Sequence, residues 1–382
     1  MPESRVVLFL HSSDELYGSD RVLLDVVSGF LRQGYQAVVV LPTDRPEPGR
    51  LKPRLEQAGA EVLKRPLAVM RRQYYSPLGA LTFIWRLGGD IVMLSALIRS
   101  RGIDLIYTNT AAVIVGVIIG RLCRRPHIWH VHEIVAASPV APLLHWLLRD
   151  GNTVLVAVSQ AVARSLPSAA RISVVHNAIT EAPIRGKPLR ERLLKGASGP
   201  LVGYVGRISS WKGHEVFLEL VRRVHRELPA ARFIMAGGPV PGQEGLVLEM
   251  VRELRDPELA CVDYLGEVEN GPELVASLDI LVSCPTRPDP FPRVVEEAQW
   301  HGVPVLGVAV GGIPELVVHG ETGLLCPIGD MDALREGLRQ MADGSLLACM
   351  SAKAQQRAQS VFRTDVFFGS LLAIAESVLP SK

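Results

Sequence analysis

The chain has 382 residues, of which 48% are hydrophobic and 21% are charged, and its formal net charge is +2. This length predicts two domains, and the aliphatic composition suits buried parallel sheets. A net charge so close to zero argues against a nucleic-acid partner, and five cysteines without a Cys-x-x-Cys pair argue against a disulfide scaffold or a zinc ribbon, which fits a cytoplasmic protein.

Positive charge gathers in the first part of the sequence. Residues 1–175 contain 20 Lys and Arg against 13 Asp and Glu, whereas the remainder contains 21 against 26. Such a basic half suits an anionic acceptor or a peripheral contact with the inner face of a membrane, and it suits an ordinary solvated surface equally well. We expect no signal peptide, because the apolar run at residues 6–10 is too short, and no membrane-spanning helix, because Arg86 and Asp90 interrupt the apolar segment 78–98.

Short apolar runs alternate with segments of helical periodicity along the whole chain, which predicts βαβ units. The strands expected in the first half are residues 6–11, 38–41, 104–108, 128–131, 154–158 and 172–176. A helix is expected to begin near Ser19, after the first strand, and to end at Gly34.

Residues 180–199 are rich in Pro and Gly and predict a linker. The strands expected after it are residues 201–205, 232–236, 262–265, 280–283 and 303–306, and a last helix is expected over 364–378. The prediction is therefore two doubly wound α/β domains, in which ligands bind beyond the carboxyl ends of the strands.

A basic loop follows the strand that is expected to end at Val205. Gly206 allows the backbone to turn, and a helix is expected to start near Gly213. Arg207 and Lys212 lie between them, and two fixed cations can neutralise a departing pyrophosphate. A solvated basic loop is the alternative interpretation.

Two carboxylates frame the helix that is expected before the strand at 303–306. Pro292 suits the first turn of this helix and leaves Asp289 outside it, while Glu297 lies within it, and Gly302 suits its end. The two acids are eight positions apart, roughly 12 Å along an ideal helix. That separation is wide for a glycosidase pair and suits two anchor points on one long ligand, although Asp289 could also simply complement the helix dipole.

Three smaller features follow other strands. Gly18 lies in a short loop that opens the first helix, which is a site for an anion by its geometry, although Ser19 and Asp20 are also ordinary helix caps. His132 lies at the carboxyl end of a strand, and the His-x-His pair to which it belongs is not a metal site without further ligands. The adjacent glycines at 311 and 312 permit a ligand to approach the backbone closely.

These segments together resemble the family 4 retaining glycosyltransferases, which have the GT-B fold of two Rossmann-like domains facing a cleft. The resemblance covers essentially the whole chain. It rests on residues 17–21, 175–178, 207–213, 289–297 (the family's Glu-x7-Glu motif), 313–315 and 320–325. It implies an acceptor-binding domain at 1–179, the linker at 180–199, a nucleotide-sugar-binding domain at 200–360, and a helix within 361–382 that crosses back to the first domain.

The resemblance further implies a hexosyltransferase that works without a metal or other cofactor. It implies a UDP- or GDP-linked sugar as the donor, and a glycan, a lipid-linked molecule or a small molecule as the acceptor. The implied catalytic residues are His132, Arg207, Lys212 and Asp289, and the implied donor-binding residues are Gly18, Gly206, Val268, Phe291, Pro292, Arg293 and Glu297.

The sequence departs from the family pattern at two of these positions. Asp289 stands where the family has Glu, and Pro292 stands where it has Gly, so the identity of the donor sugar stays open. On the acceptor side, Arg71 and Arg72 lie among aromatic residues at 70–75, and we interpret this segment as an acceptor or anionic-lipid contact.

Two other classes of function compete with this interpretation. The first is a nucleotide-sugar epimerase or a dehydrogenase of similar architecture, and no Gly-x-Gly-x-x-Gly follows a predicted strand to support the dehydrogenase. The second is a partner protein that binds a nucleotide sugar without catalysis. An assay for release of free nucleoside diphosphate distinguishes both from a transferase.

Overall fold

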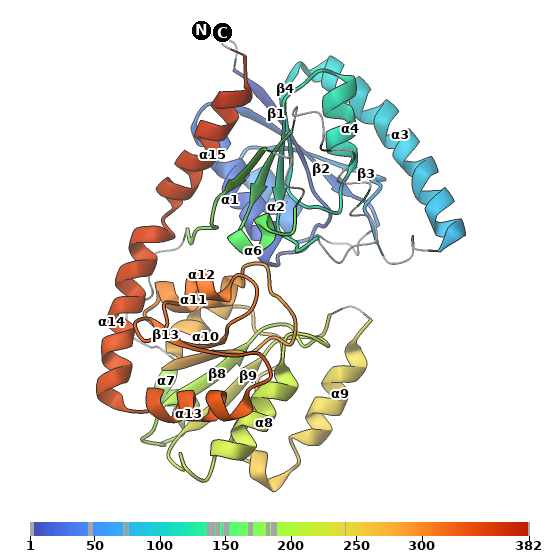
Figure 1. The fold of residues 1–382 in the computed structure, drawn as a ribbon. Coiled ribbons are helices and arrows are strands. Elements are labelled where there is room, and N and C mark those ends of the chain that lie inside the picture. Colours follow the sequence, from blue (N-terminus) through green and yellow to red (C-terminus); the bar gives the residue numbers. More distant parts are fainter. Residues whose placement is uncertain are drawn as a thin grey trace. The chain divides into compact units, whose positions relative to one another are not determined.

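The computed structural model describes residues 4–44, 49–71, 74, 76–135, 142, 146, 148, 153–166, 171–180, 184, 189–240 and 242–380. The chain folds into two compact units, drawn in Figure 1. The first comprises Met1–Ala178 and Thr364–Lys382, and the second comprises Ile179–Arg363.

The first unit contains a parallel sheet in the order β3-β2-β1-β4-β5-β6-β7. Its strands are β1 (Val6–Leu10), β2 (Gln36–Pro42), β3 (Glu61–Arg65), β4 (Ile103–Thr108), β5 (His127–Val131), β6 (Thr153–Ala157) and β7 (Arg171–Val174). Because side chains alternate across a strand, Val7 and Phe9 of β1 enter one hydrophobic layer, and Leu8 and Leu10 enter the other.

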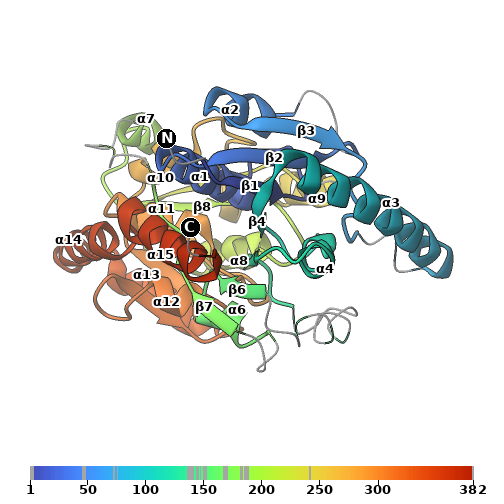
Figure 2. The same cartoon turned by 90° about the horizontal axis from the view of Figure 1, so that it is seen from above.

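Helices cover both faces of this sheet. They are α1 (Gly18–Arg32), α2 (Leu51–Gln57), α3 (Pro77–Arg101), α4 (Val115–Leu122), α6 (Gln160–Ala163) and α15 (Thr364–Val378). The layer with Phe9 contains residues of α1, α2 and α15, whereas the layer with Leu8 contains residues of α3 and α4. The last helix of the chain thus belongs to the core of the first unit, and Figure 2 shows α3 along the outer edge of that unit.

The second unit contains a parallel sheet in the order β10-β9-β8-β11-β12-β13. Its strands are β8 (Leu201–Val205), β9 (Arg232–Ala236), β10 (Val262–Tyr264), β11 (Ile280–Ser283), β12 (Val305–Val308) and β13 (Gly323–Cys326). Its helices are α7 (Arg190–Leu194), α8 (His214–Val224), α9 (Glu244–Glu253), the short 3-10 helix η2 (Pro257–Leu259), α10 (Gly271–Ser277), α11 (Arg293–Trp300), α12 (Ile313–Leu316), α13 (Met331–Met341) and α14 (Gly344–Val361). Phe217 of α8 and Leu338 of α13 pack with β-strand residues in the principal hydrophobic core of this unit.

The chain passes between the units twice, and the two passages lie beside each other. The Ile179 amide donates a hydrogen bond to the Phe362 carbonyl at 3.1 Å, and Ile179 forms an isolated parallel bridge with Arg363. The boundaries therefore fall after residues 178 and 363.

The end of the segment predicted as a linker packs on the second unit. The Leu189 amide donates to Ser277 Oγ at 3.1 Å, and Arg190 pairs with Asp279 at 2.9 Å. Asp279 in turn accepts the Leu201 amide at the start of β8. This part of the segment is tied to the sheet rather than spanning between the units.

Eleven observed strands begin and end within two residues of a predicted strand. The sequence analysis missed β3 and β13. In β3 only two of the five residues are aliphatic and none is fully buried, so the expected apolar run is absent. In β13 the strand is four residues long, and its Gly323 makes a close approach to the Val305 backbone that only the folded sheet reveals.

Candidate functional site

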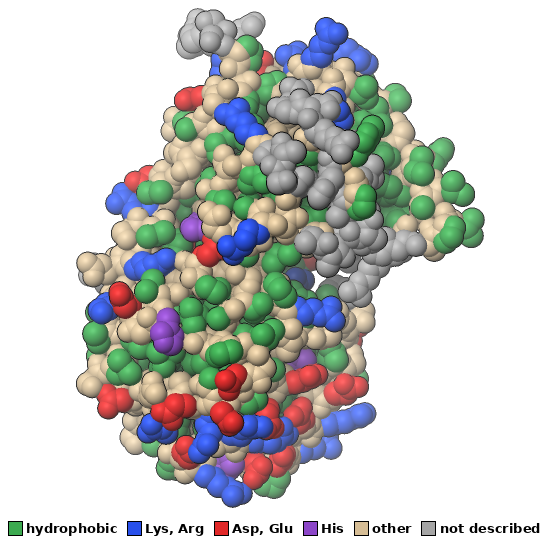
Figure 3. Space-filling model, viewed as in Figure 1, with side chains coloured by type: hydrophobic (Ala, Val, Ile, Leu, Met, Phe, Trp, Pro, Cys, Tyr) green, Lys and Arg blue, Asp and Glu red, His purple; other side chains and the backbone are tan. Residues whose placement is uncertain are grey.

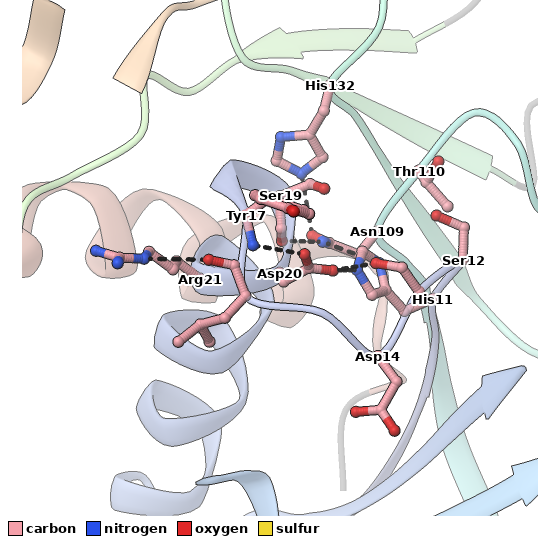
Figure 4. Close-up of polar contacts among 12 residues, drawn as sticks. His11, Ser12, Asp14, Tyr17, Ser19, Asp20, Arg21, Asn109, Thr110 and His132 are labelled. Atoms are coloured by element: carbon pink, nitrogen blue, oxygen red, sulfur yellow. Dashed lines mark hydrogen bonds and ion pairs between the residues drawn. The ribbon is translucent and has the colours of Figure 1, made fainter. Parts of the chain in front are cut away.

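Polar side chains from distant parts of the first unit form one hydrogen-bonded network beyond β1, β4 and β5 (Figure 4). Asp20 of α1 accepts hydrogen bonds from Ser13 Oγ and the Tyr17 amide, and its Oδ1 lies 2.7 Å from His11 Nε2. Asn109, directly after β4, links this group to His132, directly after β5, through a 3.1 Å contact between Asn109 Oδ1 and His132 Nε2. The predicted residue His132 therefore contacts Asn109, which in turn contacts His11, and His11 contacts Asp20.

The network fixes where the protons lie. Asn109 Nδ2 donates to the Ser19 carbonyl at 2.9 Å, which places the amide oxygen toward His132. Because that oxygen only accepts, Nε2 of His132 carries the proton and Nδ1 keeps its lone pair. A neutral His132 in this tautomer can accept a hydrogen bond from a ligand hydroxyl through Nδ1.

Burial and charge set the ionisation of this network. Desolvation lowers the pKa of His132 well below its ordinary value, and the neighbouring His130 and His11 lower it further. Burial alone would raise the pKa of Asp20, but hydrogen bonds from His11, Ser13 and the Tyr17 amide bring it below its ordinary value. Near neutral pH the network thus contains an ionised carboxylate and a neutral His132.

Gly18 is the first residue of α1. Tyr17 is the N-cap, and Asp20, three positions into the helix, accepts the Tyr17 amide. This corrects the interpretation of Ser19 and Asp20 as ordinary N-caps, because Asp20 acts instead as the acidic member of a capping box. No atom comes within 4 Å of a Cβ built on Gly18, so the start of the helix is open at this residue.

In the second unit, the basic loop at 206–213 is fastened to the end of β11. Gly213 has a φ of 84°, and a Cβ there would lie 1.8 Å from the Cys284 carbonyl oxygen, so only glycine fits. The Thr286 amide donates to the Trp211 carbonyl at 2.9 Å. These contacts bring the loop after β8 and the loop after β11 together at one edge of the sheet.

The close packing of these loops joins two predicted catalytic residues. Lys212 Nζ lies 2.6 Å from Asp289 Oδ2, and the Asp289 residue is 5% exposed. The ammonium also lies 4.5 Å from the centre of the Trp211 ring. Two residues 77 positions apart thus form a partly buried ion pair at the carboxyl edge of the sheet.

Glycines hold the loop that contains Asp289. The Gly312 amide donates to the Asp289 carbonyl at 2.8 Å, and a Cβ on Gly311, whose φ is 63°, would lie 2.1 Å from the same oxygen. We expected these glycines to allow close approach of a ligand; in the structure, the backbone that approaches them is the chain's own loop. Their role is to position Asp289.

The helix after this loop begins one residue after Pro292, which we expected in its first turn. Pro292 is the N-cap of α11, and Arg293 is its first residue. Phe291 is buried and packs edge-on against Phe362 with ring centres 6.2 Å apart. One turn later, Glu297 Oε1 lies 3.4 Å from Arg293 Nε, so these two predicted donor-binding residues contact each other.

The remaining predicted residues lie after neighbouring strands. Gly206 and Arg207 follow β8, and Val268 follows β10; all three are half-buried. Tyr204 of β8 was not predicted, yet its hydroxyl is buried without a hydrogen-bond partner among the described residues. Burial, with the nearby Cys284 and Asp289, raises its pKa well above the ordinary value.

The sequence analysis also missed His11 and Asn109. Each directly follows a strand, which was the available signal, but their partners are 9 and 98 positions away in the sequence. Of the proposed acceptor segment, residues 72, 73 and 75 lie outside the described part of the chain. Arg71 pairs with Asp44 at 2.7 Å and donates to the Ser12 carbonyl, so its charge has a partner within the unit. Within the described residues, no group of three or more His, Cys, Asp or Glu side chains is placed to hold a metal ion.

Two family models match this chain in adjacent parts. The glycosyl transferase 4-like domain matches residues 17–191, and the glycosyl transferases group 1 model matches residues 199–343. Together they extend over most of both units.

Curated relatives match over shorter stretches. The D-inositol 3-phosphate glycosyltransferase of Mycobacterium avium is 33% identical over 217 residues, which are 53% of this chain and 49% of that protein. The N-acetyl-alpha-D-glucosaminyl L-malate synthase of Bacillus anthracis is 28% identical over 158 residues, which are 41% of this chain and 40% of that protein. The chain thus spans about half or less of the length of these relatives.

Solved structures match over the full length. The crystal structure of Anabaena HepE in complex with UDP-glucose is 25% identical, covers 97% of this chain and 99% of that chain, and has a TM-score of 0.80. Sucrose-phosphate synthase from Thermosynechococcus elongatus is 18% identical with a TM-score of 0.77, covering 98% of this chain and 99% of that chain, and shows likeness of fold alone.

Proposed function

Because this chain belongs to the group 1 glycosyltransferases and has their GT-B fold, we propose that it transfers a hexose from a nucleotide-sugar donor with retention of the anomeric configuration. The acceptor is a glycan, a lipid-linked molecule or a small molecule. The observation that carries the proposal is the ion pair of Lys212 and Asp289, 2.6 Å apart at the carboxyl edge of the second sheet.

This pair suits the charge changes of sugar transfer. When the bond between the sugar and the diphosphate breaks, the diphosphate leaves with the bonding electrons, and its negative charge grows. Lys212 and Arg207 neutralise that charge without a metal ion. In the absence of donor, Asp289 keeps the Lys212 ammonium in place; with donor bound, the diphosphate takes over the ammonium, and the carboxylate accepts hydrogen bonds from sugar hydroxyls.

The other residues receive roles from the resemblance and from their positions after strands. The sugar is held by the loop around Pro292, through the backbone amides of Phe291 and Arg293. Glu297 holds the ribose, and Val268 lies beside the base. In the first unit, His132 contacts the donor sugar and Gly18 the diphosphate. Gly206 keeps the backbone turn open beside the diphosphate.

UDP is the favoured nucleotide, with GDP as the alternative. Anabaena HepE, 25% identical over nearly its whole length, was crystallised with UDP and with UDP-glucose. We propose that the enzyme is located in the cytoplasm, with access to nucleotide sugars.

The test is an assay with UDP- and GDP-linked hexoses in the presence of a chelator. We expect release of the free nucleoside diphosphate that accelerates with a hydroxyl acceptor, and an α-linked product from an α-linked donor by NMR. An epimerised nucleotide sugar would replace the proposal with epimerase activity. Binding of donor without turnover on a broad acceptor panel would replace it with a non-catalytic role.

A further inference from the structure

Helix α3 presents an unusual face to solvent. Leu78, Leu81, Trp85 and Val92 are 79%, 65%, 78% and 72% exposed. Together with Gly89 and Ala96, which are also exposed, they recur at intervals of three or four residues and therefore lie on one face of the helix. We call this face the α3 stripe; it extends about 27 Å along the helix axis.

The opposite face of α3 belongs to the core of the first unit. Leu94 and Ile98 pack in the layer that contains Leu8 and Leu10 of β1. Asp90, on the same side, accepts the Ala68 amide at 2.6 Å. The helix has the length and hydropathy of a membrane span, with a mean hydropathy of 1.6, but it could cross a bilayer only by leaving this core.

A surface helix normally carries polar residues on its outer face, whereas the only polar residue among the exposed positions of α3 from Leu78 to Ala96 is Thr82, whose hydroxyl donates to the Leu78 carbonyl within the helix. Large contiguous apolar patches on a protein surface mark sites of interaction. Figure 3 shows hydrophobic side chains gathered at the edge of the first unit where Figure 1 places α3. The stripe therefore requires an occupant.

The surrounding charge identifies the chemistry of that occupant. Between residues 66 and 103 the only acid is Asp90, which is buried, whereas five arginines lie there: Arg71, Arg72, Arg86, Arg99 and Arg101. Arg71 pairs with Asp44 and Arg101 with Glu61, and even with these two acids included, positive charge remains in excess. Residues 105–132, which include the neighbouring helix α4, contain no acid and three further arginines. An apolar stripe beside excess positive charge suits the headgroup region of an anionic bilayer, and an exposed Trp is typical of that region.

The same charge disfavours a second copy of the chain. A symmetric dimer through the stripe would bring one arginine-rich, acid-poor surface against another. We propose that the α3 stripe is a membrane-docking surface, by which the enzyme lies on an anionic lipid bilayer with α3 parallel to the membrane plane and no segment of α3 crossing it. This inference is independent of the donor chemistry proposed above.

The test is co-sedimentation of the full chain with phosphatidylcholine vesicles, with and without about 30% phosphatidylglycerol. The variant is the triple substitution Leu81→Gln, Trp85→Gln and Val92→Gln, which keeps good helix formers at exposed positions. The matched control is Leu248→Gln on α9 of the second unit, where Leu248 is 62% exposed.

We expect the wild-type chain and the control to bind anionic vesicles more strongly than neutral ones, and the triple variant to bind at least about tenfold more weakly. Thermal stabilisation by UDP should be unchanged in the triple variant, which shows that it is folded and separates this proposal from the function. Equal binding by the triple variant, or no binding by the wild type at low salt, overturns the proposal. A fall in mass of the lipid-free chain on introducing the triple variant would identify a second copy as the occupant instead.

Discussion

Different interactions stabilise the carboxyl edge of the sheet in each unit. In the first unit, a side chain of α1 and side chains that directly follow β1, β4 and β5 bond to one another, in a series that runs from Asp20 through His11 and Asn109 to His132. In the second unit, glycines bring backbone segments into contact, and Lys212 and Asp289 form the principal side-chain pair. The first arrangement depends on protonation states, and the second on the absence of side chains at a few positions.

The outer surfaces differ as well. Helices α8, α9 and α13 of the second unit carry many surface ion pairs, such as those of Arg222 with Glu253 and of Arg335 with Glu227. The outer face of α3 in the first unit is apolar from Leu78 to Ala96 except at Thr82. Charged side chains in ion pairs are well solvated by water, whereas the apolar side chains of the α3 stripe are not. This contrast distinguishes a solvent-facing helix from a docking helix.

The largest expected effect is the loss of the Lys212 ammonium. Lys212→Met should lower kcat about 10²–10³-fold, because a positioned cation no longer meets the charge on the leaving diphosphate. Steady-state kinetics with the best donor measure this, and Lys353→Met, at an exposed position on α14, is the control. Wild-type kcat in the Lys212 variant would show that the ion pair is only structural.

A second comparison isolates the glycine contacts. Gly311→Ala and Gly320→Ala both place a side chain on a residue with positive φ, but only Gly311 lies against backbone, whereas nothing lies within 4 Å of a Cβ on Gly320. Gly311→Ala should therefore lower the free energy of unfolding by about 2–4 kcal/mol, and Gly320→Ala by about 1 kcal/mol. Denaturant titration measures both, and equal losses would mean that the close approach costs nothing.

The side-chain network predicts a smaller change. Asp20→Asn should lower the free energy of unfolding by about 1–3 kcal/mol, because the charged acceptor of His11 and Ser13 is lost. The pKa of Asp20 is below its ordinary value in the folded state, so this difference is present above pH ~3.8 and is lost as pH falls through the folded pKa. Urea unfolding at several pH values tests it, with Glu56→Gln, exposed on α2, as the control. A difference that persists unchanged in strong acid would contradict the assignment.

The smallest effect concerns His127. Burial lowers its pKa from 6.5 to about 3. A histidine that is neutral when folded binds its proton only on unfolding, so it destabilises the fold progressively as pH falls below 6.5, by about 1.4 kcal/mol for each pH unit. His127→Gln should have a flatter stability curve between pH 6.5 and 5.5, followed through the fluorescence of the buried Trp129. Parallel curves for the variant and the wild type would show that folding does not lower the pKa of His127.

The alternation of strands and helices, the family resemblance and most of the residues at the edges of the sheets follow from the sequence alone. Apolar periodicity and the glycines and prolines at element ends are local signals, so α1, α8, α11 and α15 begin within one residue of Ser19, Gly213, Pro292 and Thr364, as predicted. The edge strand β3 lacks that signal because none of its five residues is fully buried.

The contacts between these residues depend on how the chain packs in three dimensions. The pairing of Lys212 with Asp289, the tautomer of His132 and the function of Gly311 depend on segments far apart in the chain that meet because parallel strands place their carboxyl ends at one edge. The α3 stripe was hidden for the same reason. The sequence shows an apolar segment interrupted by Arg86 and Asp90, but only packing reveals that Asp90 lies inward and that Leu81, Trp85 and Val92 lie outward.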